Sequence, residues 1–116
     1  MTEAELLKKL MLDGSKLGLR LFRNQVGSYE LKDGRWLTSG LCVGSSDLIG
    51  YLPVVITEAM VGRTVAVFVA VEAKGPTGRV RPEQQQFIDV VTKAGALGVI
   101  TTEPDLSAAV KEWMQR

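Results

Sequence analysis

The sequence predicts an α/β protein in which a mixed central sheet is flanked by helices, in the order αβββαβα. Three observations carry this prediction: amphipathic spacing near the N-terminus, the apolar run "TVAVFVAV" at 64–71, and a helix–strand–helix pattern from 82 onward. A chain of 116 residues is about one domain and can build one core. We therefore expect a single domain over residues 1–116, without internal repeats or linkers.

The first helix is expected at residues 3–12, because apolar side chains recur there at helical spacing. These side chains are Leu6, Leu7, Leu10 and Met11. The dipeptide Asp13-Gly14 stops the run. The segment "GLRLFRN", residues 18–24, then predicts a strand.

The next part of the chain is rich in glycine and serine. Within residues 27–46, Asp33-Gly34 predicts a hairpin turn. The segment "DLIGYLPVVI", residues 47–56, is typical of a strand. Its Pro53 favours a sheet edge or a bulge, because proline has no N–H to donate to a ladder.

The C-terminal half has the clearest periodicity. Residues 64–74 predict a core strand that is apolar on both faces, which is typical of a central position. A loop at 75–82 leads into a helix from Pro82 to about Ala94, with proline in its first turn and glycine after its end. A short strand at 97–102 and a last helix at 105–114 complete the order.

Composition excludes several classes of site and location. The chain has no histidine, which removes His general bases, Ser–His pairs and His-containing zinc sites. Its one cysteine cannot form an internal disulfide, no apolar run is long enough to cross a bilayer, and the N-terminus lacks a secretory signal. We therefore expect a cytoplasmic protein. The net charge of +1 indicates no class of partner.

Two charged residues stand at the end of the core strand. Side chains alternate along a strand, so Glu72 and Lys74 share one face while Ala73 points the other way. A carboxylate at the end of a buried strand is costly unless something pairs with it. Two interpretations follow: a structural Glu72–Lys74 ion pair, or a metal ion held with the help of further carboxylates.

Asp47 and Glu3 are the candidate further carboxylates. Asp47 stands where a Gly/Ser-rich turn runs into an apolar strand, and its alternative role is to bond the local backbone of the turn. Glu3 lies on the apolar stripe of the first helix, where it could instead complement the helix dipole. Glu5 has Lys8 and Lys9 at i+3 and i+4, the pattern of a solvated face, so we favour Glu3 as the site residue.

This combination resembles the PD-(D/E)xK nuclease superfamily and, more narrowly, the virus-type replication-repair nuclease domain, VRR-NUC. The resemblance covers nearly the whole chain. It rests on the "E-A-E-L-L" opening, "FRN" (22–24), "GSSDLIG" (44–50), "VEAKGPTGRVRPEQQQF" (71–87) and "KAGALGVI" (93–100). The resemblance implies a nuclease-like mixed sheet flanked by helices, with the acidic residues converging at one sheet edge.

The resemblance also implies site residues and chemistry. It implies phosphodiester hydrolysis that depends on Mg²⁺ or Mn²⁺, with Glu3, Asp47 and Glu72 as metal ligands and the peptide carbonyl of Ala73 as a further ligand. It makes Lys74 the catalytic lysine. This agrees with the residue types, because a divalent ion can activate water and stabilise charge on the phosphate without any histidine.

Further residues complete the expected site. Gln84, in the first turn of its helix, is expected to hold Lys74, the attacking water or a phosphate, or else to be a plain surface glutamine. Arg79 and Arg81, on a Gly-flanked loop, suit phosphate contacts, and Arg20 and Arg23 could extend this patch. Family members more often carry serine at the position of Arg81.

The resemblance also suggests partners. DNA is the expected substrate, and a four-way junction is the expected structure, because stand-alone family members are associated with junctions. A symmetric homodimer would supply two equivalent sites, with residues 41–43 and 52–56 as apolar interface candidates. A phage or a bacterium is the expected source. The alternatives are a flap or single-strand nuclease, a non-catalytic DNA-binding module of the same fold, or an unrelated small α/β interaction protein.

Overall fold

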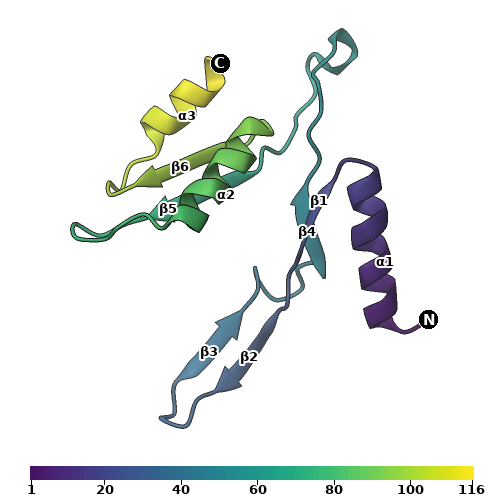
Figure 1. Cartoon of the computed structure of the whole chain (residues 1–116), viewed down its shortest axis with the longest axis vertical. Coiled ribbons are helices and arrows are strands. Elements are labelled where there is room, and N and C mark those ends of the chain that lie inside the picture. Colours follow the sequence, from purple (N-terminus) through teal and green to yellow (C-terminus); the bar gives the residue numbers. More distant parts are fainter. The chain divides into compact units, whose positions relative to one another are not determined.

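A computed structural model describes all residues, 1–116. It contains three α-helices, six strands and one 3₁₀ turn, so the α/β class is confirmed (Figure 1). The chain forms two compact units, Met1–Val54 and Val55–Arg116, and each is described in turn. No helix combines the length and the apolar character that crossing a bilayer requires.

The N-terminal unit begins with helix α1, Glu3–Lys16, which runs through Asp13 and Gly14 and is therefore longer than the predicted 3–12. Thr2 and Glu5 form a capping box: the Thr2 hydroxyl accepts the Glu5 N–H at 3.1 Å, and the Glu5 carboxylate accepts the Thr2 N–H at 3.0 Å. The helix packs on strand β1, Arg20–Arg23. Gly14 is buried in this contact. A Cβ at this position would lie only 2.8 Å from Leu21 Cδ1, so the close approach of α1 to β1 depends on glycine.

Strand β1 pairs antiparallel with β4, Leu48–Tyr51, in a register that sets Leu21 opposite Gly50. A Cβ on Gly50 would overlap the carbonyl oxygen of Arg20, so this close pairing requires glycine. The strand predicted at 47–56 is correct in place but too long. It ends at Tyr51, and Pro53 shortly afterwards has no N–H with which to continue the ladder.

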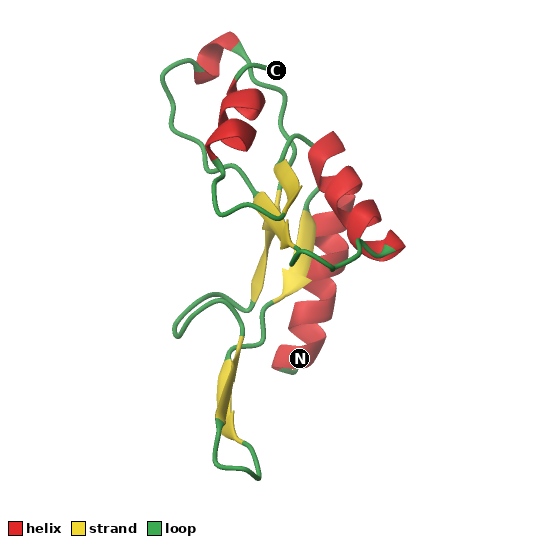
Figure 2. Cartoon of the chain, turned by 90° about the vertical axis from the view of Figure 1, so that its left-hand side faces the viewer, coloured by secondary structure: helices red, strands yellow, loops and turns green.

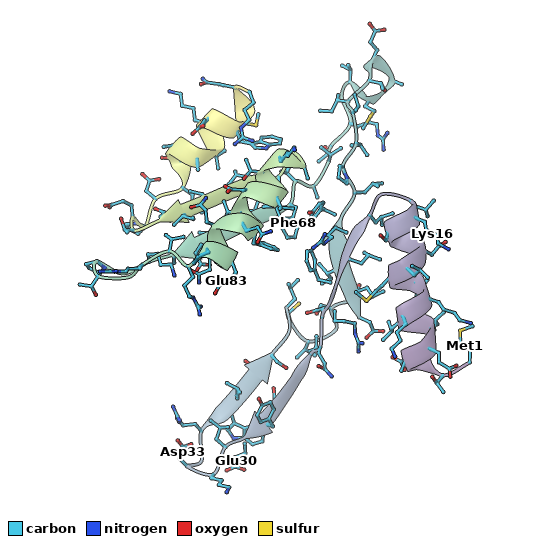
Figure 3. All side chains as sticks on the ribbon, in the orientation of Figure 1. Met1, Lys16, Glu30, Asp33, Phe68 and Glu83 are labelled. Carbon is cyan, nitrogen blue, oxygen red and sulfur yellow. The ribbon has the colours of Figure 1, made fainter.

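A hairpin lies between these paired strands in the sequence. Strands β2, Gly27–Glu30, and β3, Trp36–Ser39, pair antiparallel and expose every residue. The turn contains Gly34 at a φ of 86°, so the predicted Asp33-Gly34 turn is confirmed. Figure 3 marks Glu30 and Asp33 at this end of the hairpin. The two strands are additional to the expected αβββαβα order, because glycine and serine obscure their alternation.

The C-terminal unit is built on a parallel pair, β5, Val69–Ala73, and β6, Leu97–Thr101. Helix α2, Pro82–Lys93, packs across both strands, and α3, Ser107–Met114, packs on β6. The core residues are Ile88, Val91, Ala96 and Leu97.

Close contacts position both helices of this unit. Gly98 lets α2 approach β6, because a Cβ there would lie 2.5 Å from the Thr92 hydroxyl oxygen. The Trp113 indole N–H donates to the Gly95 carbonyl at 3.0 Å and fastens α3. Asp105 accepts the backbone N–H of Ser107 at 2.8 Å at the start of α3. This hydrogen bond and a hydrogen bond with the Ser107 side chain lower the pKa of the Asp105 carboxyl.

Both antiparallel and parallel pairing are present, as in a mixed sheet. The strands nevertheless form three separate two-stranded ladders, β1–β4, β2–β3 and β5–β6, rather than the one central sheet expected. The strand predicted at 64–74 pairs only over Val69–Ala73. The strands are short, and Figure 2 shows long loops elsewhere in the chain; the segment between β4 and β5 contains only the 3₁₀ turn Glu58–Met60.

Candidate active site

Strand β5 ends by placing two opposite charges together. Burial alternates along the strand, so Glu72 and Lys74 are partly buried while Val71 and Ala73 are exposed. The Lys74 ammonium lies 3.3 Å from a Glu72 carboxylate oxygen, with side chains 15% and 31% exposed, respectively. The Lys74 N–H donates to the Thr101 carbonyl at 3.0 Å, which holds the backbone in line with the ladder. The ion pair expected in one interpretation is therefore present.

A pocket of about 430 Å³ lies between β5 and α2, beside this pair. Most of its wall is apolar, and its polar side chains are Glu72, Glu83 and Gln84. Figure 3 labels two of the lining residues, Phe68 and Glu83. The Glu72 carboxylate thus has Lys74 as its ion-pair partner and a pocket beside it, an arrangement open to a second polar or cationic group.

Gln84 joins the helix start to this pocket. Its side-chain oxygen accepts the backbone N–H of Arg81, the N-cap residue of α2, at 3.0 Å, which is one half of a capping box. Its amide nitrogen has no hydrogen-bond partner, and the residue lines the pocket that Glu72 also lines. One end of the Gln84 amide is thus bonded to the start of the helix, and the other end can still donate.

Asp47 stands directly before β4. Its carbonyl accepts the Asn24 N–H at 2.9 Å, while its exposed carboxylate has no hydrogen bond or ion pair. The Asp47 carboxylate therefore does not bond the backbone of the turn, which was the alternative role for this residue. The sequence did not single out Asn24, whose side chain bonds the loop before Asp47; its only signal was its place at the end of the "FRN" segment.

The acids of α1 have different tasks. Glu5 is engaged in the capping box, whereas the exposed carboxylate of Glu3 has no hydrogen-bond or ion-pair partner. Glu3 lies one turn before Leu7, which packs on the inner face of the helix. The expected apolar stripe is narrower than predicted. Leu6 and Leu10 are 45% and 44% exposed, because the face toward β1 consists of Leu7, Met11 and Gly14.

The oxygen donors suit a hard divalent cation. Carboxylates and a peptide carbonyl are the ligands that Mg²⁺ and Mn²⁺ take, and Glu3 and Asp47 have carboxylate lone pairs unused by protein partners. Within neither unit do three Asp, Glu, Cys or His side chains gather so as to hold a metal ion. The residue types are those that bind such a cation: the N-terminal unit offers the carboxylates of Glu3 and Asp47, and the C-terminal unit offers the Glu72 carboxylate and the Ala73 carbonyl.

The loop before α2 carries Arg79 and Arg81, both exposed. Arg79 has no ion-pair partner. Arg81 lies 3.8 Å from Glu83, with both side chains about 70% exposed, so this pair is weak and screened by salt. Both guanidinium groups remain accessible to an anion.

Strand β1 carries Arg20 and Arg23 at its two ends, both exposed. The Arg20 guanidinium lies 5.9 Å from the centroid of the Phe22 ring, within the range of a cation–π contact. That contact extends the Arg20 side chain along the strand without neutralising its charge.

Comparison with known proteins identifies the family. The family model described as the VRR-NUC domain matches residues 19–101, from the start of β1 to the end of β6. The match includes Asp47, Glu72, Lys74 and Gln84, and α1 lies before it. No curated protein and no solved structure matches the chain. Since most of the chain matches this model, the protein belongs to the VRR-NUC nuclease family.

Proposed function

We propose that the protein is a divalent-metal-dependent DNA endonuclease that hydrolyses phosphodiester bonds. Membership of a nuclease family supports DNA as the substrate and a divalent cation as the cofactor. The observation that carries the proposal is the Glu72–Lys74 pair at the end of β5, beside a pocket, inside the matched region. We also propose that residues 1–116 act as one nuclease domain.

The proposed roles follow from charge and chemistry. Glu3, Asp47, Glu72 and the Ala73 carbonyl are the proposed ligands of Mg²⁺ or Mn²⁺, which supplies an activated water and a Lewis acid when bound. The Lys74 ammonium orients that water or offsets charge that develops on the phosphate.

Gln84 has a supporting role in this proposal. Its side-chain oxygen is used by the Arg81 N–H, so its unpaired amide nitrogen is the group that donates to water or phosphate. Because the side-chain oxygen already accepts a hydrogen bond and the amide nitrogen is free, Gln84 is better suited to donate a hydrogen bond than to bind a metal ion.

The proposed DNA contacts are electrostatic. Arg79 and Arg81 contact the phosphate backbone, and Arg20 and Arg23 extend this contact. The chain offers no base-reading motif, so cleavage follows DNA structure rather than sequence.

A four-way junction is the proposed substrate. A flap or single-stranded DNA is the second candidate, and a non-catalytic DNA-binding module is the third.

A homodimer follows from the junction proposal. Cutting two symmetric strands requires two equivalent sites, which a closed two-fold dimer supplies. The proposed interface candidates, 41–43 and 52–56, are strongly exposed: Val43 is 93% and Val55 is 86% accessible. Light scattering coupled to size-exclusion chromatography tests this; a mass near 12.6 kDa with junction cleavage intact would exclude the dimer.

A panel of labelled junction, flap, duplex and single-stranded DNAs, each with Mg²⁺, Mn²⁺ or EDTA, tests the function. We expect cleavage only with a metal, and fastest on the junction. The matched controls are Glu72→Gln and Asp47→Asn, which change one charge each. Metal-independent cleavage, or full activity of either variant, would contradict the proposed site. The fastest cleavage of a flap would select the second candidate substrate.

A further inference from the structure

The loop that leads into β4 is held by one side chain. Asn24, at the end of β1, accepts the Leu41 N–H at 2.8 Å with its amide oxygen. Its amide nitrogen donates to the Ser45 hydroxyl oxygen and to the Ser46 carbonyl, each at 2.8 Å. Three side-chain hydrogen bonds thus connect one half-buried residue to a loop 17 to 22 positions away.

The backbone is anchored at Asp47 and at the residue before it. The Asn24 amide group binds the carbonyl of Ser46, and the Asn24 backbone N–H binds the carbonyl of Asp47 itself. Two consecutive carbonyls are therefore fixed by the same residue. The Cα of Asp47 lies between these two anchored carbonyl groups. The Asp47 carboxylate can therefore move only by rotation about the bonds of its own side chain.

Ser45 extends the same network. Its hydroxyl oxygen accepts from Asn24 and from the Cys42 N–H at 3.3 Å, and its O–H donates to the Cys42 carbonyl at 2.6 Å. The Ser45 N–H also donates to the Cys42 carbonyl, at 3.0 Å, which closes the turn. An amide suits the central position, since its nitrogen carries two hydrogens to donate while its oxygen accepts, whereas a hydroxyl has only one hydrogen to donate.

We propose that Asn24 is a positioning residue for Asp47, which it holds through Ser45 and Ser46 without touching metal or DNA. This inference rests on the proposed role of Asp47 as a metal ligand. Residues that orient a metal ligand through hydrogen bonds typically contribute about 10- to 100-fold to metal affinity or activity. The Asn24 side chain makes such a contribution by restricting the backbone that carries the carboxylate.

The test compares Asn24→Ala with Ser39→Ala. Ser39 also makes a side-chain hydrogen bond at the base of the hairpin, to the Gln25 carbonyl at 3.0 Å, but makes none to the loop before Asp47. Calorimetric titration with Mn²⁺ should show a Kd raised about 10- to 100-fold in Asn24→Ala and unchanged in Ser39→Ala. Hydrogen exchange should show faster exchange of the Leu41 amide in Asn24→Ala alone, without any metal.

Ser45→Ala provides a second variant if Asn24→Ala fails to fold. It removes the bond from Asn24 to Ser45 and the two bonds of the Ser45 hydroxyl to Cys42, but it leaves the bonds of Asn24 to Leu41 and Ser46, so we expect a smaller rise in the same Kd. The loss of Mn²⁺ affinity in the double variant should be smaller than the sum of the two single losses, because Asn24→Ala already breaks the bond that the two residues share. Additive losses would indicate two independent effects and overturn the proposal.

The outcomes separate this inference from the proposed function. If the wild-type protein binds Mn²⁺ and Asp47→Asn loses that binding, the ligand role stands. Folded Asn24→Ala protein with wild-type Mn²⁺ affinity would then overturn the positioning role alone. Wild-type protein that binds no Mn²⁺ would overturn both.

Discussion

Glu72→Gln separates the two interpretations of the pair at the end of β5. The substitution keeps the size of the side chain and one oxygen that can accept from Lys74, but it removes the negative charge. A metal ligand needs that charge, whereas a structural partner needs it only in part. We therefore expect loss of cleavage with little loss of stability.

The expected size of each effect follows from the geometry. At 3.3 Å and an effective dielectric constant of about 20, the gross attraction is about 5 kcal/mol. Desolvation offsets most of it, and the 31% exposure of Glu72 places the pair between surface and buried cases. The net cost to folding is about 1 kcal/mol, since the amide keeps an acceptor. This corresponds to a fall in Tm of roughly 3–5 °C.

The effect on cleavage should be far larger. Lewis-acid stabilisation is worth several kcal/mol, and a loss of about 4 kcal/mol slows cleavage about a thousandfold. Single-turnover cleavage of labelled DNA with saturating Mn²⁺ measures this rate, and thermal unfolding measures the stability. Asp33→Asn is the control, because it removes the carboxylate from the exposed 2.6 Å pair with Arg35 in the hairpin.

A charge swap sharpens the test. Glu72→Lys combined with Lys74→Glu keeps an ion pair at the same two positions but exchanges the charges. A purely structural pair tolerates this swap, whereas the nuclease role does not. Cleavage by Glu72→Gln within about tenfold of wild type, that is within about 1.4 kcal/mol, would refute the metal-ligand assignment.

The remaining predictions concern other parts of the chain. Lys74→Ala should stop cleavage yet bind Mn²⁺ at least as tightly as wild type in calorimetry; lost binding would favour the structural pair. Arg79→Ala should reduce the log–log salt slope of duplex binding by about 0.9, and an unchanged slope would place this loop away from DNA. Gly50→Ala should destabilise the fold by about 1–3 kcal/mol in urea unfolding, because its Cβ meets the Arg20 carbonyl. Asp105→Ala should lower Tm at pH 7 but not well below pH 4, since a lowered carboxyl pKa stabilises only above the titration of that group; an equal loss at both values would contradict this.

Local geometry explains what the sequence could predict. The shared face of Glu72 and Lys74 follows from strand alternation alone, and α2 follows from a first-turn proline and a glycine after its end. Helical spacing also located α1 at residue 3. Each of these features depends on residues within one turn or two strand positions, so no knowledge of the rest of the chain is needed.

Features set by distant partners could not be predicted. The hairpin strands are held together by pairs such as Glu30 with Trp36. A Gly/Ser-rich sequence gives no pattern from which this pairing could be predicted. Asn24 acts through residues 17 or more positions away, and nothing in "FRN" indicates them. The exposure of Leu6 likewise depends on which side of α1 meets β1.

If Glu72 binds the proposed metal ion, the two interpretations of Glu72 and Lys74 describe successive states of the same site. Without a cation, a partly buried carboxylate is tolerated because Lys74 lies 3.3 Å away, and the ammonium is tolerated for the same reason. A divalent ion at Glu72 would neutralise the carboxylate and weaken its hold on Lys74. The released ammonium would then be free to donate to water or phosphate. The ion pair therefore stabilises the strand end without a metal ion and holds Lys74 at the position where the proposed mechanism would use it, so its presence is compatible with the proposed nuclease site.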